Sequence, residues 1–338
     1  MAKTKLDTQS QKVIVDAFRA IAGPDRAVAA KASMDIIQAV QTPLRQAILP
    51  GSTIAPIFSP ETYAPGERPE YPIDFLTPGL EGEHYAYVTS NHGYVPMRRV
   101  EGDYLTIPTY KIQSSIDMTL RYLRNANWNV VARAMEVLES GFVKKMNDDG
   151  WQTVLAAGLD RNLVINDDDA AVGQFTPRLI TLLNIFMRRN GGGNSGSTGR
   201  SKLTDLFVSP EAHMDIRSWG LDLIPDAARE RIYFGSEDSQ DMINIYGVNL
   251  HALDELGEDQ DYQQYYATTL GGAMAATDVE VVIGIDRQRD DSFIHPIAEP
   301  VSLFEDPTAH RQGLWSTYGW SDIGFAVLDT RRVLLGSL

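Results

Sequence analysis

The sequence predicts an α+β fold, because helices and strands are mixed along the chain without a regular βαβ rhythm. Three observations lead to this prediction: an extended run over residues 84–111, a long amphipathic helix over 126–147, and several short strand patterns in the second half. A doubly wound nucleotide-binding sheet would need strands and helices to alternate, so this fold class is disfavoured. With 338 residues the chain can form one elaborate domain or two.

Composition excludes several kinds of chemistry. The chain has no cysteine, so disulfides, thiolate nucleophiles and cysteine-ligated metals are ruled out. It has no apolar run of 18 or more residues, and its first residues lack the apolar stretch of a signal peptide. We therefore expect a soluble protein without membrane contact that stays where it is made, and whose stability comes from burial and from oligomeric contacts.

The net charge of −15 is unevenly distributed. Residues 1–50 carry seven Lys or Arg and four Asp, a net of +3, so the remaining chain carries −18. Residues 232–286 contain eleven acidic residues and no Lys or Arg. We interpret this stretch as a solvated acidic face; a docking site for the basic N-terminal region or a divalent-ion site are the alternatives. The chain after residue 50, with its net charge of −18, repels nucleic acid, which argues against sequence-specific DNA binding.

The N-terminal region is predicted to form an arm. Residues 26–40 fit an amphipathic helix with Val28, Ile36, Ile37 and Val40 as its apolar positions. Residues 50–78 then hold seven of the 17 prolines, which favour extended backbone and forbid helix. We expect this strap to pack on something larger.

An extended ribbon is predicted to follow. Turn signals at 90–93 and 101–103 separate runs in which apolar and polar residues alternate, and this alternation is typical of strands. The alternating residues are Tyr85 and Tyr87, then Leu105, Ile107 and Thr109. Because an isolated ribbon is marginally stable in water, we expect residues 84–111 to project from the body and lie on a neighbouring copy.

Two helices are predicted next. One apolar stripe along 126–147 marks the first, and Asp148-Asp149-Gly150 is expected to interrupt it. The second helix is marked by Thr176 as N-cap, Pro177 at the first position, and Arg188 with Arg189 in the last turn. The stripe residues are Trp128, Val131, Met135, Leu138, Phe142 and Met146.

The remainder is predicted to be mostly β. A short buried strand over 203–208 leads into a helix that begins at Ser209-Pro210-Glu211 and ends at Trp219-Gly220. Further strands are expected at 243–245, 248–253, 279–285, 301–304 and 324–329.

No catalytic, cofactor-binding or metal site is predicted. The glycine-rich run 191–201 lacks the spacing of a phosphate-binding loop and is expected to be a flexible surface loop. The sequence contains no GxSxG and no HExxH, and its six histidines never stand four positions apart. Asp167-Asp168-Asp169 and Asn147-Asp148-Asp149 could bind a hard cation, but solvated turns are the better interpretation. The Tyr262, Tyr265 and Tyr266 cluster, like the pair Trp315 and Trp320, is interpreted as core or interface rather than as a ligand cage.

Taken in order, these segments resemble the major capsid proteins of tailed bacteriophages, which share the Hong Kong 97 fold. The similarity covers roughly residues 80–338. The matching segments are 93–96 and 100–109, which look like the extension loop of that family, the helix over 126–147, and 203–212, 245–248 and 324–329.

The resemblance implies a domain division and a set of partners. Many copies would form hexamers and pentamers of an icosahedral virion shell around double-stranded DNA, assembled in the host cytoplasm. A separate scaffolding protein and a portal are implied as partners, and a cement protein in some members. Lys–Asn crosslinking occurs in some members, and Lys111 lies in the corresponding region, but nothing in the sequence singles it out. The implied divisions are an N-terminal arm (1–80), an extension loop (81–120), a peripheral domain with the spine helix (121–165), an axial domain with minor peripheral segments (166–320) and a C-terminal strand (321–338).

Three alternatives remain from the sequence. A monomeric binding module would have to explain the strap and the ribbon as packing within one chain. A cellular nanocompartment shell would have the same fold but would enclose a cargo enzyme instead of DNA. A carboxylate-dependent hydrolase would pair Asp167 or Asp169 with Asp254 or Glu255, and would need one carboxyl of raised pKa.

Overall fold

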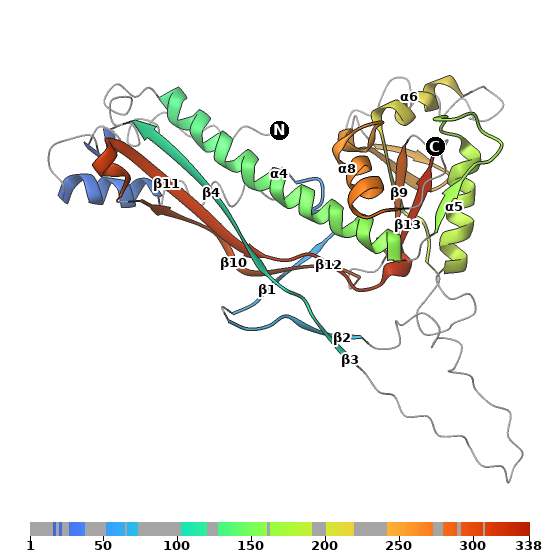
Figure 1. Ribbon diagram of the computed structural model, residues 1–338, viewed down its shortest axis with the longest axis horizontal. Coiled ribbons are helices and arrows are strands. Elements are labelled where there is room, and N and C mark those ends of the chain that lie inside the picture. The colour runs from blue at the N-terminus through green and yellow to red at the C-terminus, as the bar shows by residue number, and fades with distance from the viewer. Residues whose placement is uncertain are drawn as a thin grey trace, which may run out of the picture. The chain divides into compact units, whose positions relative to one another are not determined.

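We describe the chain from a computed structural model (Figure 1). It divides into two compact units, each built from three stretches of chain, and we describe each unit by itself. Unit 1 comprises 1–70, 106–150 and 294–326, and unit 2 comprises 71–105, 151–293 and 327–338. The residues that the structure describes are 16–17, 20–21, 27–37, 52–64, 66–73, 103–119, 128–160, 163–190, 201–219, 242–272, 280–288, 292–306 and 308–338.

Unit 1 is built on a sheet of long strands in the order β1-β10-β11-β4. β1 is parallel to β10, whereas β10, β11 and β4 are antiparallel neighbours. β4 and β11 pair over their full ten residues, from Tyr110 opposite Ile323 to Thr119 opposite Leu314. β12 adds a short pairing to β10. The bounds are β1 (Ser59–Thr62), β4 (Tyr110–Thr119), β10 (Phe293–Glu305), β11 (Leu314–Ile323) and β12 (Ala326–Val327).

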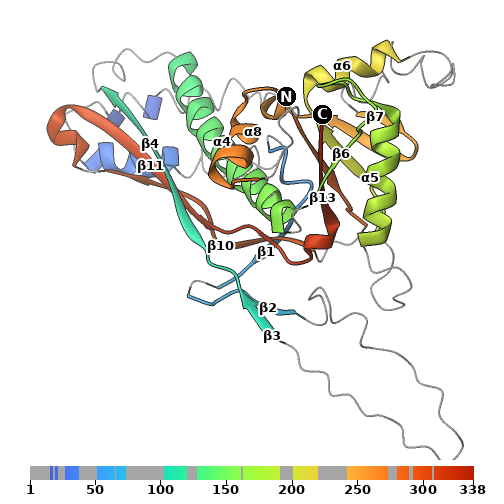
Figure 2. The same ribbon diagram turned by 45° about the vertical axis from the view of Figure 1, so that its right-hand side comes forward.

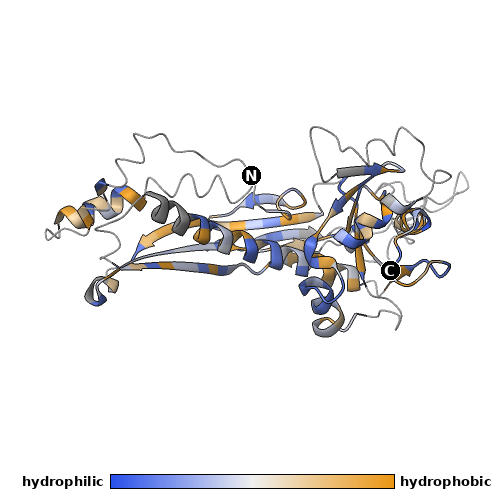
Figure 3. Cartoon of the chain, turned by 90° about the horizontal axis from the view of Figure 1, so that it is seen from above, coloured by the Kyte–Doolittle hydropathy of each residue, from blue (hydrophilic) through white to orange (hydrophobic). Residues whose placement is uncertain are grey.

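One face of this sheet holds the core of unit 1. The helix α4 (Trp128–Asp160) runs alongside it in both views (Figures 1 and 2). Phe142 of α4 is fully buried, and a Cβ on Gly319 of β11 would lie 3.3 Å from its ring. Hydrophilic and hydrophobic stretches alternate along the long strands, as expected for strands with two different faces (Figure 3). The buried members of this core are Ile21, Ile36, Ile112, Leu138, Phe142, Met146, Val301, Leu303, Trp315 and Ile323.

The interruption predicted at 148–150 is wrong, because α4 continues to Asp160. Tertiary contacts hold the helix through this segment. Asp149 accepts hydrogen bonds from the Tyr110 hydroxyl at 2.7 Å and from Lys145 at 2.6 Å. A Cβ on Gly150 would lie 2.4 Å from Ile54, so glycine permits a close approach that any side chain would prevent.

Unit 2 contains a mixed sheet in the order β5-β13-β9-β6-β8-β7. β13 is parallel to β5 and antiparallel to β9, and β6 is parallel to β8. The central strands are buried on both faces, as their continuous apolar sequences require. The bounds are β5 (Val164–Asn166), β6 (Asp205–Val208), β7 (Met242–Ile245), β8 (Val248–Ala252), β9 (Val281–Ile285) and β13 (Val333–Ser337).

The two helices with clear local signals are confirmed. α5 (Pro177–Asn190) begins after Thr176, whose hydroxyl accepts from the Leu179 N–H, and Arg188 and Arg189 lie in its last turn. α6 (Pro210–Ser218) is capped by Ser209, whose hydroxyl accepts from the Ala212 N–H at 3.0 Å. The shorter elements are η2 (Asp254–Leu256), α8 (Asp261–Gln264), the π-helix η3 (Tyr265–Thr269), η4 (Ala309–Gln312) and η5 (Thr330–Arg332).

The predicted strand segments are partly right. β6 to β9 match the expected segments, but the strand expected at 301–304 is the end of the much longer β10, and that at 324–329 shrinks to β12. Two long strands, β4 and β11, were not predicted as such. β2 (Glu70–Ile73), in the proline-rich strap, pairs with β3 (Asp103–Thr106).

The arm and the extended ribbon are described only in part. In the helical segment 27–37, Ile36 is buried as expected, whereas Val28 is 51 % exposed; Val40 lies outside the described residues. Of the predicted ribbon, 84–102 lies outside the described residues. At the end of the ribbon that adjoins β4, Ile107 is buried and its N–H donates to the Pro69 carbonyl at 3.0 Å. This end of the ribbon therefore packs within its own chain.

Candidate functional site

The aspartates considered for hydrolysis support a helix terminus. The buried Asp167 accepts a hydrogen bond from the Thr176 hydroxyl at 2.5 Å, and Thr176 in turn caps α5. Arg178 forms ion pairs with Asp167 at 3.3 Å and with Asp169. Asp254 and Glu255 begin η2, a separate element. Asp167 and Asp169 are therefore engaged in fixing the loop before α5.

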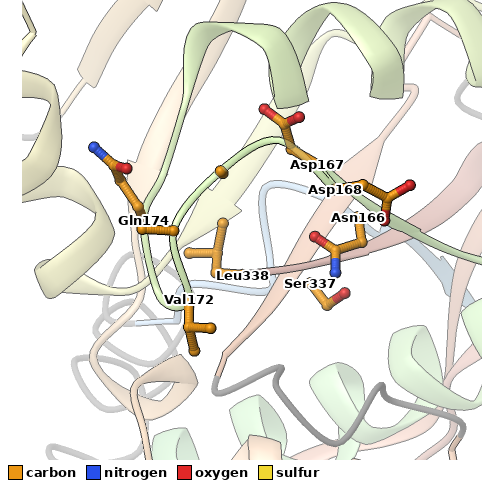
Figure 4. Close-up of a pocket in the computed structure, with 9 residues that line it drawn as sticks. Asn166, Asp167, Asp168, Val172, Gln174, Ser337 and Leu338 are labelled. Atoms are coloured by element: carbon orange, nitrogen blue, oxygen red, sulfur yellow. The ribbon is translucent and has the colours of Figure 1, made fainter.

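A small cavity adjoins the same loop (Figure 4). It has a volume of about 150 Å³. The buried Ser337 hydroxyl lines it and has no hydrogen-bond partner among the described residues. Polar side chains dominate a space that suits a few water molecules rather than a drug-sized ligand. The lining residues are Asn166, Asp167, Asp168, Ala170, Ala171, Val172, Gln174, Ser337 and Leu338.

His251 forms the clearest histidine–carboxylate pair. Its Nε2 lies 2.8 Å from Asp205 Oδ1, and its ring stacks on Phe207 with centroids 4.8 Å apart. The Arg287 guanidinium lies 3.7 Å from the same oxygen. The hydrogen bonds and charges of these partners lower the pKa of Asp205 despite its burial. Asp205 is thus paired both with His251 and with the Arg287 guanidinium, which is always charged and cannot act as a nucleophile. We interpret these three side chains as a structural ion cluster.

Several other histidines and tyrosines considered in the sequence analysis lie in the core or outside the described residues. His295 is buried, its Nδ1 lies 2.8 Å from the Gly324 carbonyl, and burial lowers its pKa. Tyr262 and Tyr266 are buried, and Tyr262 lies against Trp151 of α4 with ring centroids 6.4 Å apart, as expected for core aromatics. The loop 191–200 and the histidines His84 and His92 lie outside the described residues.

Acidic side chains gather around the buried Glu280. Burial raises its pKa, and the nearby Glu211, Asp215 and Glu258 add to this shift, while a hydrogen bond from Ser209 opposes it. In the part of the chain that the structure describes, no group of three or more His, Cys, Asp or Glu side chains could hold a metal ion.

No described helix has the length and apolar character needed to cross a membrane.

The face of the unit 1 sheet opposite its core carries a cluster of aromatic rings. Phe304, Tyr318 and Trp320 are half-buried, with centroids 5.6 Å apart for Phe304 and Tyr318 and 4.7 Å for Phe304 and Trp320. Since Gly319 between them faces α4, these rings point the other way. The Lys111 ammonium lies 4.8 Å from the centre of the Trp320 ring. We call this surface the aromatic face.

Carboxylates border the aromatic face. Glu299 accepts from Trp320 Nε1 at 2.9 Å, and Asp117 accepts from the Ser316 hydroxyl. Asp322, opposite Lys111 in the β4–β11 register, has a buried Oδ1 without a hydrogen-bond partner among the described residues. Sequence reasoning missed this surface, because Trp315 and Trp320 were interpreted together as core or interface, although they lie on opposite faces of β11.

Comparison with known proteins gives matches in structure alone. No protein-family model matches the chain, and no curated protein matches its sequence. The capsid asymmetric unit of cyanophage Pam1 aligns with a TM-score of 0.56 and 11% identity, over 86% of this chain and 92% of that one. The capsid of the cyanophage P-SCSP1u aligns with a TM-score of 0.54 and 10% identity, over 83% and 86%.

The chain has the fold of phage capsid proteins. A capsid of a native GTA particle matches as well, with a TM-score of 0.53 and 10% identity over 85% of this chain and 90% of that one. The α+β class and the capsid-like architecture predicted from the sequence are thereby confirmed. Because these matches cover most of both chains, the likeness extends over both units and not over one motif.

Proposed function

We propose that this chain is a major capsid protein that assembles with copies of itself into an icosahedral shell enclosing double-stranded DNA. The observation that carries the proposal is the agreement in fold with subunits of capsid shells over more than four fifths of the chain. Catalysis has no part in this role, and the virion is the expected location.

The arrangement of charge supports such a role. A packaged genome must be enclosed without being bound sequence-specifically, and a chain of net charge −15 disfavours extensive phosphate contacts. The basic residues 1–50 are the natural exception, and we propose that they contact acidic surface on a neighbouring copy. A scaffolding protein, a portal and a cement protein are partners that this role would require or accommodate.

The contacts between copies are proposed to include the extension loop. Among the described residues, β2 and β3 form a two-stranded pairing of four residues each, too short to be stable alone. We propose that 84–102, beyond β3, lies on a neighbouring subunit.

The direct test is electron microscopy and size-exclusion chromatography of the purified full-length chain. Closed particles of uniform diameter are expected, and a monomer of 37.5 kDa at all concentrations would contradict the proposal. Nuclease-protected double-stranded DNA in particles from producing cells separates a viral shell from a cellular compartment, which would contain a cargo enzyme instead.

A further inference from the structure

β4 is an edge strand of the unit 1 sheet, since the strand order β1-β10-β11-β4 places it last. It runs for ten residues and pairs with β11 throughout, without a bulge or a shift of register. Its sequence contains no proline. Among the residues that the structure describes, none forms a backbone hydrogen bond to its outer edge. A long, regular edge of this kind is a template for pairing with a further strand.

The residue types of β4 are arranged symmetrically about Ser114. Lys111 and Asp117 stand three positions to either side of it and carry opposite charges. Ile112 and Ile116 stand two positions to either side, and both are apolar. A strand with this symmetry is complementary to a second copy of itself that runs antiparallel, with Ser114 opposite Ser114.

In such a pairing each Lys111 lies opposite the Asp117 of the other copy, so the ion pair forms twice. Residues opposite each other in antiparallel strands share a face of the sheet. Lys111 and Asp117 are both exposed on the face that carries the aromatic rings. Ile112 and Ile116 lie on the other face, where both pack in the core of unit 1. The pairing therefore matches charges on one face and joins two apolar cores on the other.

Other registers lose this match. A shift by one residue turns the side chains of the second copy to the wrong face. A pairing centred on Gln113 places Lys111 opposite Ser115. One centred on Ser115 places Asp117 opposite Gln113. Neither brings opposite charges together, so the register centred on Ser114 is favoured.

We propose that two copies of this chain join edge to edge through β4, antiparallel and in the register centred on Ser114, so that their unit 1 sheets become one. Charge complementarity favours a second copy as the occupant, since β4 itself supplies both members of each ion pair. A two-fold contact cannot close a ring of five or six copies, so it joins one ring to the next; this place in a shell rests on the proposed function. The contact is separate from any made by 84–102, because β4 lies within the unit 1 sheet.

Engineered cysteines test the register, since the natural chain has none. Gln113→Cys and Ser115→Cys are both exposed, and the proposed register places each opposite the other in the second copy. Cα atoms directly opposite are about 4.5–5.5 Å apart and can be bridged by a disulfide, whereas diagonal neighbours at about 7–8 Å cannot. Mixing the two single variants before oxidation should give roughly tenfold more linked dimer than either variant alone, with the 113–115 link identified by mass spectrometry.

A charge test complements the crosslink. Lys111→Asp alone, or Asp117→Lys alone, places like charges opposite each other twice and should lower the yield of closed shells roughly tenfold. Mixing the two single variants restores opposite charges between unlike copies and should return the yield to within about twofold of the wild type. Any effect within one chain is the same before and after mixing. The matched control Lys144→Asp makes the same change of charge at an exposed position of α4 and should leave the yield unchanged.

The outcomes separate the two proposals. If wild-type shells form but the cysteine mixture links no better than a single variant, or the mixed charge variants assemble no better than each alone, this inference is wrong and the proposed function stands. If the chain forms no shells but the cysteine mixture still links selectively, the proposed function fails and the β4 contact stands. If neither shells nor selective links form, both are wrong.

Discussion

Replacing Asp329 with alanine should destabilise unit 2 severely, because this carboxylate neutralises buried arginine. Arg331 donates to it from Nε at 2.8 Å and from Nη2 at 3.0 Å, and both side chains are almost fully buried. Asp329 also accepts from the Arg331 N–H at the start of η5, and Arg332 lies 3.5 Å away while pairing with Asp286. The alanine variant would leave one guanidinium without its principal counter-charge.

The magnitude follows from what is removed. Two charge-assisted hydrogen bonds contribute about 1.5–3 kcal/mol each and the cap about 1 kcal/mol, but these contributions are not additive. Removing one partner of a buried ion pair costs about 3–5 kcal/mol, which we take as the expected loss in the free energy of unfolding. For a unit of this size the midpoint of thermal unfolding should fall by about 10 °C.

Thermal unfolding followed by circular dichroism at pH 7 measures this loss. Asp160→Ala is the matched control: it removes an exposed carboxylate at the end of α4 and should change stability by less than about 0.5 kcal/mol. The double variant Asp329→Ala with Arg331→Met should lose less than Asp329→Ala alone, because no unpaired guanidinium remains at position 331. An Asp329→Ala variant as stable as Asp160→Ala would refute the reasoning.

Three further predictions concern burial, packing and the arm. The raised pKa of Glu280 means that its deprotonation destabilises the folded state, so stability should fall as pH rises above about 4.5, the usual pKa of Glu. Glu280→Gln should flatten this fall and raise the unfolding midpoint at pH 8, as thermal scans from pH 5 to 8 would show. Gly319→Val should lower the free energy of unfolding, measured in urea, by about 1–3 kcal/mol, because its Cβ would lie 2.8 Å from Leu303. The control is Gln113→Ala, at an exposed position that also lies in a strand, which should lower it by less than about 1 kcal/mol. Deleting residues 1–50 should block closed-shell assembly while circular dichroism shows a folded body, and high salt should weaken assembly of the intact chain only modestly; wild-type-like particles from the truncated chain would contradict this.

The sequence predicted best those elements whose signals are local. α5 and α6 start where Thr176, Ser209 and the prolines that follow them indicate, since capping depends on residues within one turn. The course of α4 through Asp148-Asp149-Gly150 could not be predicted, because Tyr110 and Ile54, distant in sequence, stabilise it there. Likewise the pairing of β4 with β11 could not be predicted, because no local pattern indicates which strands lie side by side when they are so far apart in the sequence.

Of the surfaces described above, the sequence did not indicate the aromatic face. Tyr318 and Trp320 alternate with Gly319 and Ser321, which is a strand pattern, yet only the register with β4 and β10 brings Phe304 and Lys111 to the same face. The buried Asp322 Oδ1, which has no hydrogen-bond partner within the described part of the chain, depends on that packing and has no counterpart in the sequence pattern.

The three-segment construction of each unit has a consequence for synthesis on the ribosome. Asp117 of β4 bonds Ser316 of β11, which lies 199 positions later in the chain. At the usual ~5–20 residues per second, β4 waits roughly 10–40 s for its partner strand. Unit 2 likewise lacks β13 until residues 333–337 have been made. Contacts that depend on a finished sheet, including any through the aromatic face, therefore begin only once these late strands have joined their partners.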